Sequence, residues 1–439
     1  MTNSGSESAL KSADGSPAPP RSLPEGRLLF LLGAVQFVNI VDFVMVLPLG
    51  PDFARALAIP THQLGLVAGS YTAAAAIAGL SVSSFLDRFD RRKALLVAML
   101  GLALGTAAGG FATGLVSMAF ARVLAGAFGG PATSIAMSIL SDAIPAARRG
   151  RAMGKVMGAF SVASVVGVPA GLELARLGWQ VPFFVIATLG VLVALGVGLQ
   201  MPPMRAHLLP VGQARAGSKP LGAFLADPPV WLALSGTAVA MAGSFSLITN
   251  LSSFVQFNLG YPRDKLGILY MLGGSVAFFT LRLAGRAVDR WGSPLVVSAG
   301  TALVVAVISL AFIPDRPLIP TIAIFVGFML ANSTRMVALN ALTTRVPLPR
   351  DRARFMSLQS AVQHLSTSAG ATFSTWVLHE RPDQSLEGMA TLAFGAVALA
   401  LMLPPLLALL HTRVRARDAA LLAAGIPATV PSAVREVAP

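Results

Sequence analysis

Long apolar stretches constrain the fold of this chain more than any other feature of its sequence. A bilayer core about 30 Å thick is crossed by roughly 20 residues of helix, and stretches of this kind recur twelve times. They cover residues 28–50, 64–86, 94–112, 114–140, 152–175, 180–201, 230–250, 264–284, 294–313, 318–342, 354–379 and 388–410. Charged residues make up 12% of the chain, about half their share in soluble proteins and too little to cover a water-exposed surface. We therefore expect an all-α integral membrane protein with twelve transmembrane helices.

One long polar connection, residues 202–229, divides the expected helices into two sets of six. We expect six-helix bundles at 27–201 and 230–411, with 202–229 as a cytoplasmic linker. Residues 1–26 are rich in Ser and Pro and contain no apolar signal-peptide segment, so we expect a disordered tail there. Residues 412–439 are expected to form a C-terminal tail.

Lysine and arginine are concentrated in alternate connections between the expected helices, as in "DRFDRRK" and "ARRGRAMGK". Loops rich in these residues stay on the cytoplasmic side of a membrane. Both ends of the chain fall on the same side as the basic connections. The sequence therefore predicts a multi-pass protein of the plasma membrane (the bacterial inner membrane) with both termini in the cytoplasm.

Ionisable residues at membrane depth are costly and indicate functional sites, and Asp42 and Arg122 are two such residues. Asp42 follows Gln36 and Asn39 at helical spacing, so the three share a helix face that we expect to line a cavity. Counting along the expected helices places Arg122 at the depth of Asp42, about 12 Å below the outer surface. We predict that the pair couples transport to protons, because a carboxylate beside a cation stays ionised until the cation's influence is lost. A static ion pair and direct substrate binding by Asp42 are the alternatives.

Other polar residues within the expected helices are candidates for lining a substrate cavity. They are Asn250, Asn332, Arg335, Gln359 and Gln363. For Arg335 the alternative is a side chain that extends to the inner membrane surface. The helices are otherwise mostly apolar, which favours an amphipathic or drug-like substrate over a phosphorylated one.

Several classes of function are excluded by residue types. The chain has no cysteine, which removes disulfides, thiolate metal sites and cysteine nucleophiles. Its five histidines are too dispersed for a metal site, and there is no glycine-rich phosphate loop. The net charge of +14 is spread over short clusters, unlike the continuous basic stripe of a nucleic-acid-binding protein. We expect no enzymatic activity, cofactor, metal or nucleic-acid partner.

A charged turn recurs in the two halves of the chain. Asp87 and Arg88 in "LDRFDRRK" are separated from Asp289 and Arg290 in "GRAVDRWGSP" by close to half the chain. A six-helix internal repeat accounts for this spacing.

These features resemble the major facilitator superfamily over essentially the whole chain. The family's loop pattern G-x-x-x-D-R-x-G-R-R is matched by four charged residues: Asp87, Arg88, Arg91 and Arg92. Its two glycine positions hold Ser83 and Asp90 here, whereas the second copy keeps Gly285 and Gly292 and lacks the arginine pair.

Two helix motifs extend the resemblance. "RVLAGAFGGPA", which begins at Arg122, is similar to the family's R-x-x-x-G-x-x-x-G pattern, with Gly126 and Gly130 at the glycine positions. "VVGVPAG" is similar to the glycine–proline signature of the family's antiporters. Its Gly167 and Pro169 are separated by one valine, a form typical of the sugar- and drug-efflux branch.

The resemblance implies two bundles around a central cavity whose access alternates between the two sides of the membrane. It assigns a conformational gate to Asp87, Arg88, Arg91, Arg92, Asp289 and Arg290, and helix packing to Gly126, Gly130, Gly167, Pro169 and Gly171. We expect a monomeric secondary active transporter that uses the proton gradient to export a small amphipathic or drug-like compound. Efflux of a sugar or sugar derivative is the alternative, and a non-transporting receptor or scaffold on the same fold is a third reading.

Overall fold

Long helices make up most of the structure, a computed structural model that describes residues 23–86, 89–204, 222, 224, 226–314, 316–348 and 351–423. The first half contains α1 (Glu25–Ala56), η1 (Thr61–Gln63), α2 (Leu64–Leu86), α3 (Arg91–Gly110), α4 (Leu115–Ala143) and α8 (Val181–Gln200). Between α4 and α8 lies a divided crossing made of α5 (Ala146–Met157), α6 (Ala159–Val162), η2 (Ala163–Gly167), α7 (Val168–Leu174) and η3 (Ala175–Leu177).

The second half repeats this plan. It contains α10 (Pro228–Ser253), η5 (Phe254–Asn258), η6 (Arg263–Lys265), α11 (Leu266–Trp291), α12 (Ser293–Phe312), α13 (Thr321–Thr343), α14 (Arg352–Val377) and α15 (Met389–Ala423). A short antiparallel hairpin of β1 (His379–Glu380) and β2 (Leu386–Glu387) joins α14 to α15.

The prediction of an all-α membrane fold with twelve crossings is confirmed. Within the described residues, eleven segments are long and apolar enough to span a bilayer. The twelfth crossing is α14, which carries Gln359, Gln363 and His364 and several hydroxyl residues. It packs against α2 and α10. Ser368 donates to the Gly69 backbone oxygen on α2, and Ser374 accepts from Asn250 on α10. Polar side chains that meet neighbouring helices in this way are tolerated at membrane depth.

Several helix ends differ from the expected boundaries. α15 continues to Ala423 and so includes residues 412–423, which we expected in the C-terminal tail. Polar contacts fix these extra turns, because Arg417 donates to the backbone oxygens of Arg345 and Val346, and Asp418 pairs with Arg345 at 3.2 Å. Most of the expected linker and both distal tails lie outside the described residues.

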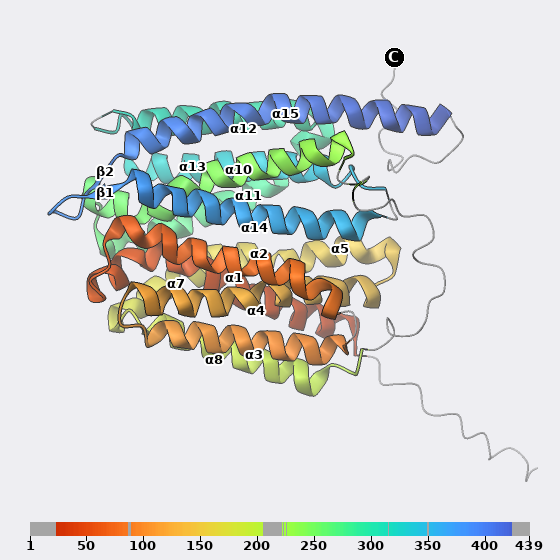
Figure 1. Cartoon of the computed structure of the whole chain (residues 1–439), viewed down its shortest axis with the longest axis horizontal. Helices are drawn as coiled ribbons and strands as arrows, with labels where there is room; N and C mark the ends of the chain where they lie inside the picture. The colour runs from red at the N-terminus through yellow and green to blue at the C-terminus, as the bar shows by residue number, and fades with distance from the viewer. Residues whose placement is uncertain are drawn as a thin grey trace, which may run out of the picture.

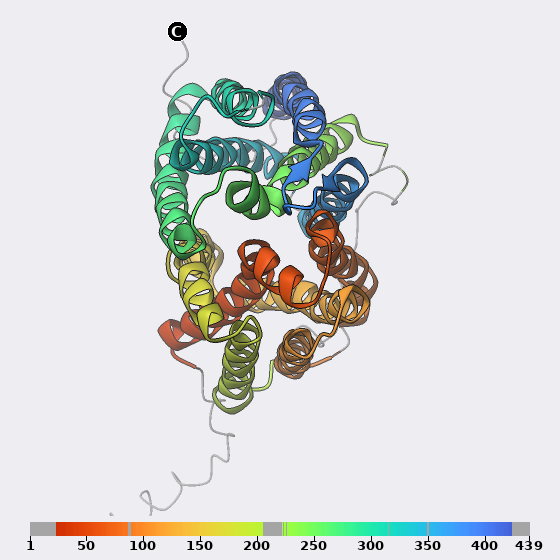
Figure 2. The same cartoon turned by 90° about the vertical axis from the view of Figure 1, so that its left-hand side faces the viewer.

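The two halves form bundles that lie side by side. α1 to α8 occupy the lower part of Figure 1 and α10 to α15 the upper part, and the end-on view in Figure 2 shows the same separation. The chain enters α1 and leaves α15 at one end, called here the tail side, and the β1–β2 hairpin marks the opposite end, the hairpin side (Figure 1). Contacts between the bundles run from α2 to α14 and from η2 and α7 to α11.

Glycines allow α2 and α4 to pack with their backbones in contact. A Cβ atom on Gly126 would lie 2.1 Å from the backbone oxygen of Tyr71, and one on Gly130 would lie 2.8 Å from that of Ala75. Neither distance leaves room for a methyl group. Small residues at four-residue spacing are therefore a steric requirement of this helix pair.

The fifth crossing departs from regular α-helix next to a proline. Residues Ala163–Gly167 form a π-helical turn, and Pro169 follows in the first turn of α7. Proline lacks the N–H that a helix interior requires, so a local change of hydrogen bonding is expected there. Gly167 and Gly171 lie on the side that meets α1, where added Cβ atoms would approach Val41 and Met45 at 2.6 and 3.1 Å.

Candidate transport site

A buried ion pair joins α1 to α4 inside the first bundle. Arg122 Nη1 lies 3.0 Å from Asp42 Oδ1, and Arg122 Nη2 donates to the Asp42 backbone oxygen at 3.2 Å. The side chains of Arg122 and Asp42 are 1% and 0% exposed. Since a charge is tolerated out of water only when it is paired and hydrogen-bonded, each of these residues is required by the other.

Two further helices complete the surroundings of this pair. Thr106 on α3 donates its hydroxyl to Asp42 Oδ1 at 2.7 Å. The ring of Tyr71 on α2 faces the Arg122 guanidinium, whose Cζ lies 4.5 Å from the ring centroid. All of the first four helices therefore contribute a group, and a shift of any of them alters the environment of the ions.

One oxygen of the Asp42 carboxylate makes no hydrogen bond among the described residues. Among the described residues, Asp42 Oδ2 and Arg122 Nε have no hydrogen-bond partner. Buried polar atoms without partners are rare in folded proteins and call for an explanation. Because the hydrogen bonds from Thr106 and Arg122 reach Oδ1 or the backbone, a proton can be added at Oδ2 without displacing a donor.

The other polar residues on the α1 face are held by helix contacts. Asn39 donates to the Gly129 backbone oxygen at 2.6 Å and to Thr133 at 2.8 Å, and it accepts from the Tyr71 hydroxyl at 2.7 Å. Gln36 is also buried, with Oε1 unpartnered among the described residues. In this conformation Gln36 and Asn39 lie within the first bundle rather than in the cavity described below.

The candidate cavity residues of the second bundle are likewise engaged with neighbouring helices. Asn250 donates to Ser374 at 2.8 Å, Asn332 accepts from Ser244 at 2.7 Å and Gln359 donates to Thr343 at 3.1 Å. Gln363 is half-buried.

Arg335 is buried inside the second bundle and does not extend to the membrane surface. It is 3% exposed, and its described hydrogen bond is to Asn332 at 3.4 Å. Its side chain packs toward Gly300 on α12, where an added Cβ would lie 2.9 Å from Arg335 Cγ.

The charged turn between α2 and α3 is tied to its own bundle. Asp87 and Arg88 lie outside the described residues. Arg91 forms an ion pair with Asp142 at the end of α4, and Arg92 donates to the Gly198 backbone oxygen on α8. These contacts bring α3, α4 and α8 together on the tail side.

Asp90 stands where the family's loop pattern has glycine, and it caps α3. Its Oδ1 accepts from the backbone N–H of Arg92 at 3.0 Å and of Met204 at 3.1 Å. An aspartate at this position satisfies backbone donors that a glycine would leave to water. In the second copy of the turn, Asp289 and Arg290 are exposed, and Arg290 lies over the Trp291 ring.

Polar contacts on the hairpin side close the two bundles against each other. Arg263 holds Asp52 of the other bundle with two parallel contacts, Nε to Oδ1 at 2.8 Å and Nη2 to Oδ2 at 2.6 Å. Arg263 also donates to the Leu172 backbone oxygen at 3.1 Å. Sequence reasoning missed this contact, because Asp52 and Arg263 look like ordinary interface charges until the bundles are placed together.

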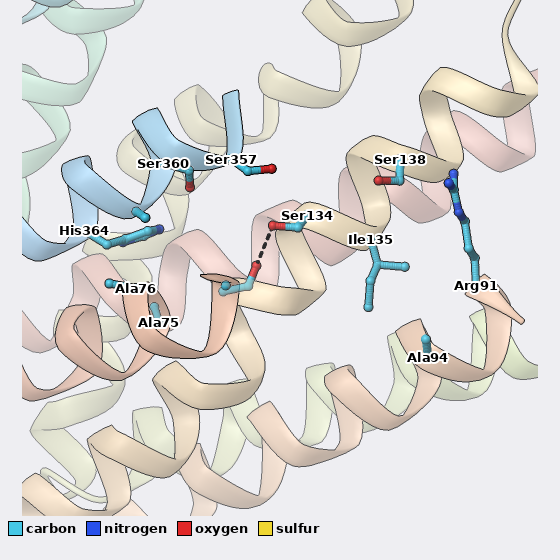
Figure 3. A pocket seen from close by; sticks show the side chains of 13 residues that line it. Ala75, Ala76, Arg91, Ala94, Ser134, Ile135, Ser138, Ser357, Ser360 and His364 are labelled. Atoms are coloured by element: carbon cyan, nitrogen blue, oxygen red, sulfur yellow. Dashed lines mark hydrogen bonds between the residues drawn. The ribbon is translucent and has the colours of Figure 1, made fainter. Parts of the chain in front are cut away.

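A cavity of about 300 Å³ lies between the bundles in their tail-side half. Figure 3 shows its walls, with α2, α3 and α4 contributing from the first bundle and α14 from the second. The polar side chains that line it are Arg91, Ser134, Ser138, Ser357, Ser360 and His364. The structure is therefore closed on the hairpin side and hollow on the tail side.

Comparison with known proteins settles the family. The sequence profile described as Major Facilitator Superfamily matches residues 32–371. The chain belongs to the major facilitator superfamily. It is a membrane transporter, not an enzyme, and our recognition of the family from its loop and helix motifs is confirmed.

The relatives of this superfamily member include efflux proteins. It is 27% identical over 78% of its length to a chloramphenicol resistance protein of Streptomyces lividans, and the match covers 86% of that protein. It is 25% identical over 54% of its length to the purine ribonucleoside efflux pump NepI of Salmonella typhimurium, spanning 57% of the pump. Among solved structures, a bacterial homologue of the lysosomal transporter Spinster superposes with a TM-score of 0.71 at 19% identity, covering 89% of this chain and 97% of that one.

Proposed function

We propose that this protein exports a small amphipathic organic compound from the cytoplasm in exchange for protons. The observation that carries the proposal is the buried pair of Asp42 and Arg122, with one carboxylate oxygen free to accept a proton. Ionisable side chains are costly at membrane depth and indicate functional sites, and this pair can act in coupling if its charge changes during the transport cycle.

The chemistry of the pair supports coupling. While Asp42 is ionised, it neutralises the buried Arg122 guanidinium. Protonation of Oδ2 leaves that guanidinium beside a neutral acid, and an uncompensated buried charge costs several kcal/mol. A helix movement that brings water or substrate dipoles to Arg122 relieves this cost. Protonation therefore favours one conformation of the bundles over the other.

Export is the proposed direction of transport, and the proposed orientation gives a solute its route into the protein from the cytoplasm. Basic connections lie on the tail side, so we place that side and both termini in the cytoplasm of a bacterial cell. The hollow in the tail-side half then faces the cytoplasm, ready to receive an internal solute. We propose that the protein acts as a monomer in the plasma membrane, without a cofactor.

The substrate class is supported by the relatives and by the cavity. The names of two relatives refer to resistance to chloramphenicol and to efflux of purine ribonucleosides, and both are neutral compounds with hydroxyl groups. The hydroxyl side chains of the cavity also suit the second candidate, a sugar or sugar derivative. Proton-coupled efflux assays should therefore include chloramphenicol, inosine and a neutral disaccharide.

Substrate-induced proton movement in proteoliposomes tests the proposal. The wild type should move protons when a transported compound is added, and Asp42→Asn should bind the compound but move none. Asp42→Glu, which keeps an acid, should retain part of the coupling. The matched control is Asp383→Asn, an exposed carboxylate of the β1–β2 turn. Undiminished coupling in Asp42→Asn would reject the assignment, and a receptor or scaffold predicts no flux in any variant.

A further inference from the structure

A groove with a volume of about 670 Å³ lies between α11, α12 and α13. All three helices belong to the second bundle (Figure 1), so the groove is separate from the cavity between the bundles. Leu283 of α11 and Leu295 of α12, which line it, are 61% and 59% exposed. Exposed apolar side chains on membrane-spanning helices mark a surface that meets the membrane. The groove is therefore open to lipid.

The length of the groove matches one leaflet of a bilayer. On α11 its lining runs from Thr280 to Trp291, which is eleven residues or about 16 Å of helix. The hydrocarbon core of a bilayer is about 30 Å thick, so one leaflet contributes about 15 Å. Because Trp291 ends α11 on the tail side, the groove extends from that membrane surface toward the middle of the bilayer.

The inner part of the groove is suited to an acyl chain. Its walls there are aliphatic, with Ala284 and Ala287 on α11, Ala299 on α12 and Leu330 on α13. The hydroxyl of Thr280 donates within α11, to the Val276 backbone oxygen at 2.7 Å. That of Thr334 donates within α13, at 2.8 Å. An acyl chain placed here deprives no polar group of its hydrogen-bond partner.

Two arginines lie at the tail-side end of the groove. Arg286 and Arg290 are one helical turn apart on α11, within five residues of its end, and both are exposed. Among the described residues neither forms an ion pair, and the neighbouring Asp289 does not line the groove. The Cζ atom of Arg290 lies 5.8 Å from the centroid of the Trp291 ring. Tryptophan is typical of the headgroup level of membranes, and guanidinium groups bind phosphate through paired hydrogen bonds.

We propose that this groove binds an anionic phospholipid of the leaflet on the tail side. Arg286 and Arg290 bind its phosphate, and one acyl chain lies along the aliphatic walls of α11, α12 and α13. Charge complementarity selects the anionic lipid, because the described lining carries two unpaired cations and no carboxylate. Basic pockets between transmembrane helices hold anionic headgroups in this way. The site involves neither the buried ion pair nor a transported compound, so the inference goes beyond the proposed function.

Native mass spectrometry of the full chain in detergent tests the site. The two probes are phosphatidylglycerol and phosphatidylcholine with the same oleoyl chains. The first bound phosphatidylglycerol should be held about 30-fold more tightly than the first phosphatidylcholine, which corresponds to about 1 kcal/mol for each arginine. Arg286→Gln with Arg290→Gln should remove this preference. Arg413→Gln with Arg415→Gln is the matched control, since it takes two exposed charges from the tail-side end of α15, and should leave the preference intact.

A variant that fills the groove separates the lipid chain from the charge. Ala299→Trp should weaken phosphatidylglycerol binding about tenfold, the equivalent of exposing roughly two methylene groups of the acyl chain. Glycerol 3-phosphate, which has the phosphate and no acyl chain, should not displace the lipid, and its displacement of the lipid would indicate a simple anion site instead.

Two results would overturn the proposal. One is equal affinity of the unaltered chain for the two lipids, and the other is an equal loss of preference in both arginine variants. The first comparison uses no substitution, so it is decisive even where a variant fails to fold.

Discussion

Replacing Arg263 by Gln should shift the protein toward a conformation open on the hairpin side. Arg263 makes charge-assisted hydrogen bonds across the bundles to Asp52, with side chains 28% and 16% exposed respectively. Such bonds contribute about 1.5–3 kcal/mol each when buried, and partial exposure reduces this value. We therefore expect a net loss of about 2 kcal/mol from the closed state, which corresponds to a change of about 30-fold in the equilibrium between the two states.

Thiol labelling from the hairpin side measures this shift. Ser252 is buried between the bundles, where its hydroxyl donates to the Pro48 backbone oxygen at 3.3 Å. A membrane-impermeant maleimide should label Ser252→Cys slowly in the otherwise natural chain and about 30-fold faster when Arg263→Gln is added. Arg381→Gln removes an ion pair confined to the hairpin and should have no effect. Equal labelling rates with and without Arg263→Gln would refute the idea that this contact holds the bundles together.

Three further predictions concern packing, the ion pair and the hairpin turn. Gly126→Ala places a methyl group 2.1 Å from the Tyr71 backbone oxygen and should lower the free energy of unfolding by about 1–3 kcal/mol. Thermal unfolding in detergent should therefore show a lower Tm for this variant. Gly154→Ala is the control and should leave the Tm unchanged, because nothing lies within 4 Å of the added methyl group. Tyr71→Phe keeps the ring beside Arg122, so its rate of coupled transport should stay within a few-fold of the wild-type rate. Tyr71→Leu removes a cation–π contact of about 2 kcal/mol and should reduce the transport rate in proteoliposomes about 30-fold. Hydrogen bonds from the Ser385 hydroxyl and backbone N–H lower the pKa of the Asp383 carboxyl, so the order they give the turn is present above the usual carboxyl pKa of about 4 and is lost as pH falls through the lowered pKa. Ser385→Ala removes the hydroxyl bond and keeps the backbone bond, so it should reduce this acid-dependent change in protease sensitivity of the turn.

Counting residues along helices was enough to find the centre of the first bundle. Depth below the surface is fixed by the rise per residue, so Asp42 and Arg122 could be placed at the same level from sequence, and their side chains are in contact. The same reasoning did not reveal Thr106 or Tyr71, because a hydroxyl or a ring within an apolar helix has no distinctive pattern. Their roles depend on the rotation of α2 and α3 about their axes.

Contacts between the bundles were beyond sequence reasoning. Asp52 and Arg263 come from separate halves of the chain, and no periodicity relates them. The spacing of Asn39 along its helix predicted a cavity-lining side chain. Its amide instead donates hydrogen bonds to Gly129 and Thr133, because α1 and α4 pack closely there. Helix identity follows from local composition, whereas the use of a polar side chain depends on neighbours distant in the chain.

The polarity of α14 has a consequence for biogenesis. This helix lacks the apolar window found in the eleven other crossings of the described chain, and it packs against α2 and α10. Segments rich in polar side chains partition poorly from the translocon into lipid on their own. The ribosome completes both of its neighbours before α14 emerges, so insertion of this segment depends on helices that are already in place. A chain whose α2 or α10 is displaced should fail during synthesis, before transport can be measured.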